Sequence, residues 1–515
     1  MVAAAISSIL LFLLPSIVSA GTPAPANYYS DQLVDHDSCC DDRRWAQRYY
    51  VWGKEFQGPG HPIFVIIGGE GNVEPSTGLF YPFVTHHLAK DFGAFVLEPE
   101  HRFYGESQPV SITPDDDPRE LLFTSKQALQ DAMRLIGHYQ SKLGCSQNKT
   151  SPGYCPVITV GGSYPGWLSA MARLVFPDVV DMAYAASAPM TFYSQQVDPG
   201  AYYEHISKVA EKSMPGCFEQ VQHTLYVVNA ILQVLPFSDL DNMVQAFGFC
   251  ADTRPDYIQD MKTLGEELFM VIGYTFANDN MANYPPDNTT RLYGACETFS
   301  SIKLDPVQRV KQFIKQHLLP KNSNEEDGCA NMGTQMPTGP NATISGGDWS
   351  GVGTGTSGES WDFQTCTLLV EQIGFSPASM FPPRNWTLDW MTKHCQSRFG
   401  VTPQPTKLVK EWRFDDLAGS TNASHIIFTN GLNDGWSVGG IKENISDTLV
   451  VINFENGAHH SDLSGKGPSD QDTPDIREGF NTIRNILTDW LNTLRLGRYP
   501  VSKVSNLRPV AEVKL

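Results

Sequence analysis

One stretch of the sequence constrains the fold more than any other, because an apolar run meets a glycine-rich turn and continues into a helix-forming segment. The run is Val157-Ile158-Thr159-Val160, and the turn that follows is Gly161-Gly162-Ser163. A strand, a sharp turn and a helix in this order are typical of a nucleophile elbow, which holds a serine hydroxyl clear of its own backbone. We therefore expect Ser163 to be a nucleophile. The alternative is that Gly-Gly-Ser is an ordinary turn.

The same stretch predicts one oxyanion-hole donor, and an earlier loop predicts a second. A helix N-terminus presents free N–H groups, so the N–H of Tyr164 is the first candidate. Pro165 replaces the second glycine of the common G-x-S-x-G pattern, which a helix start tolerates. Gly68-Gly69-Glu70-Gly71 follows an earlier β-rich run. The N–H of Gly69 or Glu70 is the second candidate, and a plain strand-ending turn is the alternative.

Short β-rich runs alternate with helix-compatible segments in the first part of the chain, which favours a mostly parallel sheet. We expect strands at Ile63 to Ile67, Ala94 to Leu97, Val157 to Val160 and Met182 to Ala186, with a crossover helix at Ser125 to Leu143.

Helical patterns then replace the strands from Met190 to about residue 400. We expect helices at Tyr202 to Lys212, Phe218 to Leu235, Arg254 to Tyr274 and Pro306 to Leu319, and a loop at Ser345 to Gly358. Strands return at Ile426 to Thr429 and Leu449 to Ile452, before a final helix at Ile476 to Leu494. The predicted fold is α/β, with core segments 21–192 and 406–515 interrupted by a helical cap at 193–405, after a signal peptide at 1–20.

Each of the two returning strands ends in a loop that carries a polar candidate. The first loop contains Asp434 and the second contains the pair His459-His460. The chain order is serine, aspartate, histidine, which is the order of α/β-hydrolases. In that arrangement the histidine takes the serine proton and Asp434 orients the imidazole. Asp434 could instead be a turn residue, and chemistry alone does not choose between the two histidines.

Composition excludes several classes of partner. The net charge of −19 and the isoelectric point near 5.1 argue against nucleic acid and anionic membranes. Residues 1–20 resemble a secretory signal, and no later stretch is apolar and long enough to span a bilayer. The ten cysteines lack metal-ligand spacing, so we expect no metal and no cofactor. Six sequons predict glycosylation at Asn148, Asn288, Asn341, Asn385, Asn422 and Asn444.

These features together resemble a family of secreted serine peptidases that includes lysosomal Pro-X carboxypeptidase, dipeptidyl peptidase II and thymus-specific serine protease. The resemblance covers nearly all of the mature chain. It rests on Gln47 to Tyr49, Gly68 to Gly71, Glu100 to Gly105, Gly161 to Gly166, Ala186 to Pro189, Asn283 to Pro285, Trp361 to Cys366, Asn430 to Trp436 and Gly457 to His460.

The resemblance implies an α/β-hydrolase core with a helical cap, and a triad of Ser163, Asp434 and His459, the first histidine of the pair. It implies cleavage after proline near a chain end, with Trp436 as an aromatic wall of the proline pocket; the alternative for Trp436 is a core side chain. It also implies the disulfides Cys217–Cys296, Cys250–Cys329 and Cys366–Cys395, which leave Cys145 and Cys155 to close a short loop. Partners for Cys39 and Cys40 stay open.

The resulting hypothesis is a secreted or lysosomal/vacuolar serine exopeptidase that acts on short peptides and could form a homodimer. Whether it works as a carboxypeptidase or as a dipeptidyl-peptidase stays open. A lipase or carboxylesterase would share the elbow and the chain order. A binding protein without catalytic activity, built on a hydrolase scaffold, is the alternative from another class.

Overall fold

The computed structural model describes residues 25–73, 81–113, 117–236, 239–319, 328–333, 356–420, 422–463 and 467–498. The predicted signal peptide at 1–20, the sequon at Asn341 and most of the predicted loop at Ser345 to Gly358 lie outside these ranges.

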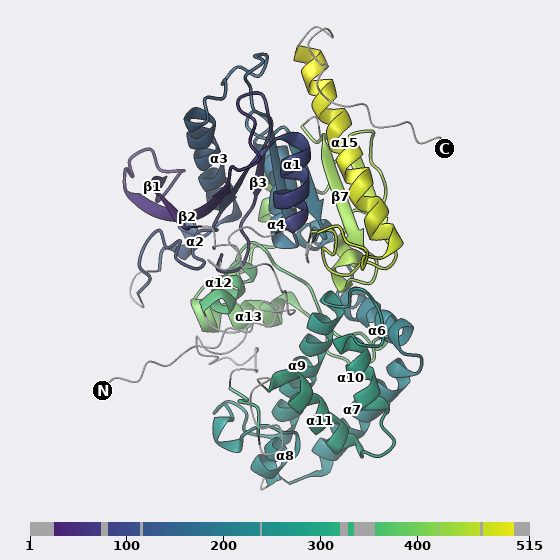
Figure 1. Ribbon diagram of the computed structural model, residues 1–515. Coiled ribbons are helices and arrows are strands. Elements are labelled where there is room, and N and C mark those ends of the chain that lie inside the picture. Colours follow the sequence, from purple (N-terminus) through teal and green to yellow (C-terminus); the bar gives the residue numbers. More distant parts are fainter. Residues whose placement is uncertain are drawn as a thin grey trace, which may run out of the picture.

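An eight-stranded sheet forms the centre of the α/β part (Figure 1). Its spatial order is β1-β2-β4-β3-β5-β6-β7-β8, in which β1 and β2 are antiparallel and all pairs from β4 onward are parallel. The strands are β1 Asn27–Leu33, β2 Arg44–Trp52, β3 Ile63–Ile66, β4 Phe95–Pro99, β5 Val157–Gly162, β6 Met182–Ala186, β7 Ile426–Gly431 and β8 Leu449–Phe454. A long parallel sheet behind an antiparallel edge confirms the predicted α/β-hydrolase core.

Helices cover both faces of this sheet because its strands are apolar on both sides. Ile63 and Val65 face a core shared with α3 (Ser125–Lys142) and α4 (Tyr164–Val175). Phe64 and Ile66 face the opposite core. That core is shared with the segment η1 (Phe83–Leu88) and α1 (Ala89–Phe92), and with the final helix α15 (Pro474–Arg498). Strands buried on both faces are typical of parallel sheets.

Helices dominate the described chain between β6 and β7, and most of them gather in a block below the sheet in Figure 1. They are α5 Met190–Tyr193, α6 Ala201–Ser213, α7 Cys217–Val234, α8 Leu240–Ala246, α9 Met261–Met281, α10 Arg291–Ser300, α11 Pro306–Leu318, α12 Thr356–Thr365, α13 Leu388–Phe399 and α14 Lys407–Trp412. Of the described helices, none has the length and apolar character that crossing a bilayer requires. The boundaries at 192 and 405 remain predictions.

The differences from the sequence-based expectations include the start of one helix and the strands β1 and β2, neither of which was expected. The helix expected from Arg254 begins at Met261 instead, because the side chain of Asp260 accepts a hydrogen bond from the N–H of Thr263 and caps the helix there. Strand β2 contains Arg48, whose buried guanidinium bonds to Glu100 and Glu106 far along the chain, so no local pattern could reveal that a charged residue would be accommodated there.

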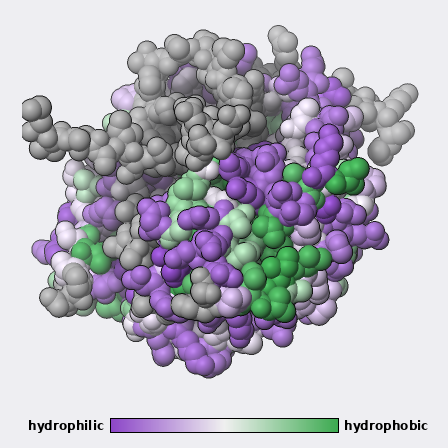
Figure 2. Space-filling model, turned by 90° about the horizontal axis from the view of Figure 1, so that it is seen from below, coloured by the Kyte–Doolittle hydropathy of each residue, from purple (hydrophilic) through white to green (hydrophobic). Residues whose placement is uncertain are grey.

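The structure contains four disulfides, of which three join the pairs that the resemblance implied and one joins the pair of cysteines left over. They are Cys145–Cys155, Cys217–Cys296, Cys250–Cys329 and Cys366–Cys395. The five sequons in the described ranges have exposed asparagines: Asn148, Asn288, Asn385, Asn422 and Asn444. Glycosylation of these residues stays a prediction. Figure 2 views the molecule from the side of the helical block, and most of the described surface there is hydrophilic.

Candidate active site

Ser163 lies in a sharp turn between β5 and α4. Its backbone has φ 66° and ψ −133°, a conformation that a residue other than glycine rarely adopts. The N–H of Ser163 donates to the carbonyl of Ala186 on the neighbouring strand β6, at 2.9 Å, and its carbonyl accepts the N–H of Trp167 at 3.1 Å. The strained turn is therefore fixed from both sides, as a nucleophile elbow requires.

Glycines allow helix α4 to cross the sheet at close range. A Cβ at Gly161 would lie 2.2 Å from the carbonyl oxygen of Pro165, and one at Gly166 would lie 2.5 Å from the carbonyl oxygen of Ala186. Both distances are shorter than any side chain could tolerate. The glycines at positions 161 and 166 are thus explained by the close approach of helix α4 to strands β5 and β6.

Asp434 and His459 lie side by side although 25 residues separate them. Nδ1 of His459 lies 2.6 Å from Oδ2 of Asp434, whose side chain is fully buried. The other carboxylate oxygen, Oδ1, accepts the backbone N–H of Trp436 at 3.1 Å. A carboxylate held in this way accepts the Nδ1–H of the imidazole, which leaves Nε2 to accept a proton from elsewhere.

The neighbouring His460 differs from His459 in its surroundings. Its N–H donates to Oγ of Ser187 at 2.9 Å, and its backbone has a positive φ of 35°. Burial, together with charge on His459, holds the pKa of His460 well below its ordinary 6.5. Its ring fills the space where a Cβ on Gly162 would be, 2.8 Å from that position. The histidine pair therefore packs directly on the residue that precedes Ser163.

The loop with the predicted oxyanion-hole donors lies against the start of α4. A Cβ on Gly69 would come within 2.5 Å of Cγ of Pro165, so the backbone of this loop touches the turn that follows Ser163. The next residue, Glu70, has a pKa raised by burial, which the charge of His459 opposes. The candidate oxyanion-hole donors thus lie close to one another: the loop of Gly69 and Glu70 contacts the turn that contains Tyr164.

Trp436 lies in an aromatic cluster beside the Asp434–His459 pair. Its ring centroid is 5.3 Å from that of Phe192, 4.9 Å from that of Tyr202 and 6.4 Å from that of His459. The side chain is 8% exposed. Its role as the wall of a proline pocket remains a prediction, since its ring is mostly packed among other aromatic side chains.

Three residues of this neighbourhood were not identified from the sequence. Tyr81 accepts the N–H of Gly162 on its hydroxyl at 3.2 Å. Met281, at the end of α9, accepts the N–H of His459 on its carbonyl at 3.2 Å.

The third residue, Asn280, is fully buried next to Met281. Its side chain donates to the carbonyl of Asn433 at 2.7 Å and accepts the N–H of Gly435 at 2.8 Å. The helical part of the chain thus supports both loops that carry Asp434 and His459. The one available signal was a run of three polar residues, Asn278 to Asn280, near the end of the helix.

A group of side chains elsewhere resembles a metal site only in composition. Asp362, Cys366 and His394 lie close together and are buried. However, Cys366 forms a disulfide with Cys395, so its sulfur is not a thiolate. Asp362 also pairs with Arg398 at 2.8 Å. We interpret the group as a structural ion-pair cluster that joins α12 to α13.

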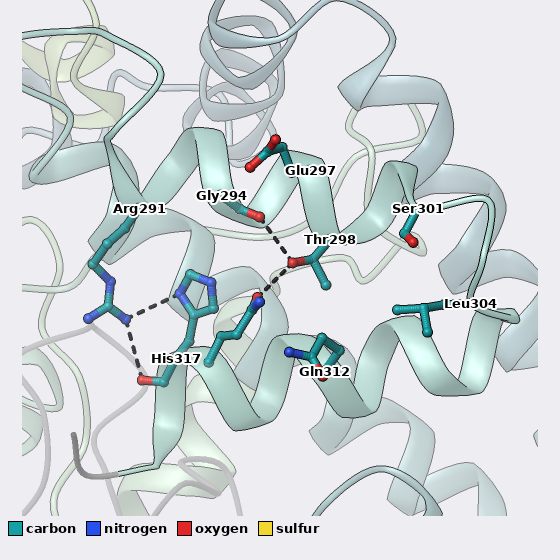
Figure 3. A pocket seen from close by; sticks show the side chains of 9 residues that line it. Arg291, Gly294, Glu297, Thr298, Ser301, Leu304, Gln312 and His317 are labelled. Atoms are coloured by element: carbon teal, nitrogen blue, oxygen red, sulfur yellow. Dashed lines mark hydrogen bonds between the residues drawn. The ribbon is translucent and has the colours of Figure 1, made fainter. Parts of the chain in front are cut away.

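A separate pocket of about 540 Å³ opens between α10 and α11 (Figure 3). Arg291 points across it toward His317, and Thr298 donates to Gln316 at 2.6 Å. All of its lining residues belong to the helical part: Arg291, Gly294, Glu297, Thr298, Ser301, Leu304, Gln312, Gln316 and His317. None of them is a triad candidate, so the pocket adds nothing to the chemistry at Ser163.

Comparisons with known proteins identify the family of this chain. The chain matches the family described as Serine carboxypeptidase S28 over residues 32–483. It is 31% identical to lysosomal Pro-X carboxypeptidase of Mus musculus over 469 residues, which cover 87% of each chain. The protein of the same name in Homo sapiens is 30% identical over 464 residues, covering 87% of this chain and 86% of that one. Thymus-specific serine protease of Mus musculus is 25% identical over 497 residues, covering 92% and 88%.

The predicted location agrees with these relatives and with the four disulfides, because disulfides persist in oxidising compartments. The protein is secreted or lysosomal. The match over most of the sequence and the arrangement around Ser163 lead to one assignment: the chain belongs to the serine carboxypeptidase S28 family and is a serine peptidase.

Proposed function

We propose that the protein is an exopeptidase that hydrolyses short peptides after proline, with Ser163 as nucleophile, His459 as general base and Asp434 as the residue that orients the imidazole. The single observation that carries the proposal is the 2.6 Å contact between Nδ1 of His459 and the buried carboxylate of Asp434, on loops beside the elbow of Ser163. This contact leaves Nε2 as the proton acceptor that a serine nucleophile needs.

In the proposed reaction Oγ of Ser163 attacks the scissile carbonyl while Nε2 of His459 takes the hydroxyl proton. Negative charge then develops on the carbonyl oxygen. In the proposed reaction the N–H of Tyr164 and one N–H from Gly69 or Glu70 donate to that oxygen. Collapse of the intermediate releases the amine, which receives the proton from His459. Water then hydrolyses the acyl-enzyme by the same steps.

The preference for proline and for chain ends is supported by three observations. The similar proteins include Pro-X carboxypeptidases by name. In this chain, Trp436 lies beside His459, and a proline ring would pack against the small part of its side chain that is not covered by the other aromatic residues. The end of α9 contacts the loops of Asp434 and His459, so the helical part adjoins the site, where it would restrict entry to a chain end.

Two short peptides with one internal proline test the proposal, one blocked at its amino end and one at its carboxyl end. We expect release after proline from one of them and much slower release from its counterpart in which alanine replaces proline. The blocked end that is tolerated would distinguish dipeptidyl-peptidase from carboxypeptidase action. Equal cleavage of the proline and alanine peptides would contradict the proline preference. Equally fast internal cleavage of a long denatured polypeptide would contradict the role of the helical part.

A further inference from the structure

Two adjacent cysteines stand apart from the other eight. Cys39 and Cys40 lie at the tip of the connection between β1 and β2, and both are exposed. Their sulfur atoms are 3.0 Å apart. The other cysteines form the four disulfides, so this is a chain in which oxidation of thiols is the rule.

The turn that carries the two thiols is held in place from both sides. Oγ of Ser38 accepts the N–H of Cys40 at 3.3 Å and that of Asp41 at 3.1 Å. Before the turn, Nε2 of His36 lies 2.7 Å from the buried carboxylate of Asp131 on α3. The base of the connection is thus anchored on the core, while the tip reaches solvent with both sulfurs on the same side of a turn.

We propose that Cys39 and Cys40 form a vicinal disulfide, and that this bond is a reversible redox site on the surface of the protein. A disulfide oxidant of the secretory pathway supplies the chemistry. One thiolate attacks the oxidant and forms a mixed disulfide, and the neighbouring thiolate then displaces the oxidant. Two protons leave the cysteines, and the oxidant takes up two electrons and becomes a dithiol.

Adjacency makes this bond easier to reduce than the other four. Consecutive Cα atoms are about 3.8 Å apart across a trans peptide, whereas disulfides usually join Cα atoms roughly 4.4–6.8 Å apart. The resulting small ring is strained, and strained, exposed disulfides are the ones that thiols reduce. Three of the other bonds each contain a cysteine that is 0% exposed: Cys155, Cys217 and Cys366. In the fourth, Cys329 is exposed, but its Cα lies 5.0 Å from that of Cys250, within the usual range for an unstrained disulfide.

The purified full-length protein tests the proposal by thiol labelling and peptide mapping. No Lys or Arg precedes Arg43, so tryptic cleavage there releases a peptide with these two cysteines and no others. Without reductant, we expect no labelling of this peptide by N-ethylmaleimide and a mass two hydrogens below that of the dithiol. With rising dithiothreitol, both cysteines should become labelled before any of the other eight. The reduced protein should then bind phenylarsine oxide, which needs two neighbouring thiols.

Two variants distinguish a bond within one chain from free thiols and from a bond between two chains. Cys40→Ser should leave Cys39 open to labelling without reductant, and the double variant C39S/C40S should lose arsenical binding while keeping peptidase activity. Labelling of both cysteines in the untreated wild-type protein would overturn the proposal. So would a disulfide-linked dimer on a non-reducing gel that disappears in the double variant, or reduction only together with the Cys145–Cys155 bond.

Discussion

Replacing Asn280 by leucine should damage catalysis without touching a triad residue. Asn280 ends helix α9, and its side chain bonds to the backbone on both sides of Asp434, through Asn433 and Gly435. Leucine has the same branching and the same number of side-chain heavy atoms, but no polar atom. It would therefore leave a buried carbonyl and a buried N–H without partners, and the loop would move to regain them.

The size of the effect follows from these two bonds. An unsatisfied buried polar group costs about 1–3 kcal/mol, so the two groups together cost at least about 2 kcal/mol. If the loss appears as misplacement of the carboxylate beside His459, about 2 kcal/mol corresponds to a fall in kcat/KM of roughly 30-fold. We expect the fall mostly in kcat, because Asn280 does not lie among the residues that would hold the peptide.

The assay is steady-state hydrolysis of a proline peptide by wild type, Asn280→Leu and the control Asn278→Ala. Asn278 lies on the same helix and is partly exposed, so its replacement should leave kcat/KM nearly unchanged. Thermal melts monitored by circular dichroism would show that the variants are folded. A folded Asn280→Leu protein with kcat/KM within about threefold of wild type would refute the role of α9 in positioning Asp434.

Two further predictions concern the site, and a third concerns the buried His101, whose Nε2 lies 3.1 Å from the hydroxyl of Tyr164. Gly162→Ala should lower kcat/KM by about 10- to 100-fold, because the new Cβ would lie 2.8 Å from the ring of His460. The control is Gly137→Ala, at an exposed position in a helix where a Cβ would meet no atom within 4 Å, and it should leave kcat/KM unchanged. Asp434→Asn should lower kcat by about 10⁴-fold in the same assay, because the amide favours the wrong imidazole tautomer; a fall of less than tenfold would exclude the assigned role. Burial lowers the pKa of His101 to about 4, whereas the pKa in the unfolded chain is about 6.5. Between these two pH values the unfolded chain binds more protons than the folded protein. The free energy of unfolding should therefore fall by up to about 3 kcal/mol as the pH is lowered from 6.5 to 4. Denaturant titrations near pH 4 and near pH 7 should show a smaller pH dependence for His101→Gln than for wild type, and an equal dependence would contradict this.

Local patterns were sufficient for much of the core. Strand β6 has the predicted bounds, and α3 differs by one residue at its end, because apolar periodicity and end signals agree within each segment. The elbow at Ser163 was also predictable, since glycines and the helix start are contiguous with it. The loops of Asp434 and His459 follow predicted strands, and parallel strands bring their carboxyl ends to one edge.

Features that depend on distant contacts were not predictable. The two histidines have the same chemistry, and only the fold brings His459 to Asp434 while it turns His460 toward Gly162. Likewise Asn280 reads as an ordinary polar residue at a helix end. Its importance comes from its hydrogen bonds to the loop of Asp434, which lies 153 and 155 residues further along the chain.

The most direct test of Ser163 as the nucleophile is the reaction of the purified protein with a fluorophosphonate probe, followed by peptide mapping. We predict one adduct, on Oγ of Ser163, that is absent from Ser163→Ala and forms far more slowly in His459→Gln, while His460→Gln is labelled faster than His459→Gln. A wild-type protein that forms no adduct, or one that carries it on another serine, would contradict the assignment of Ser163.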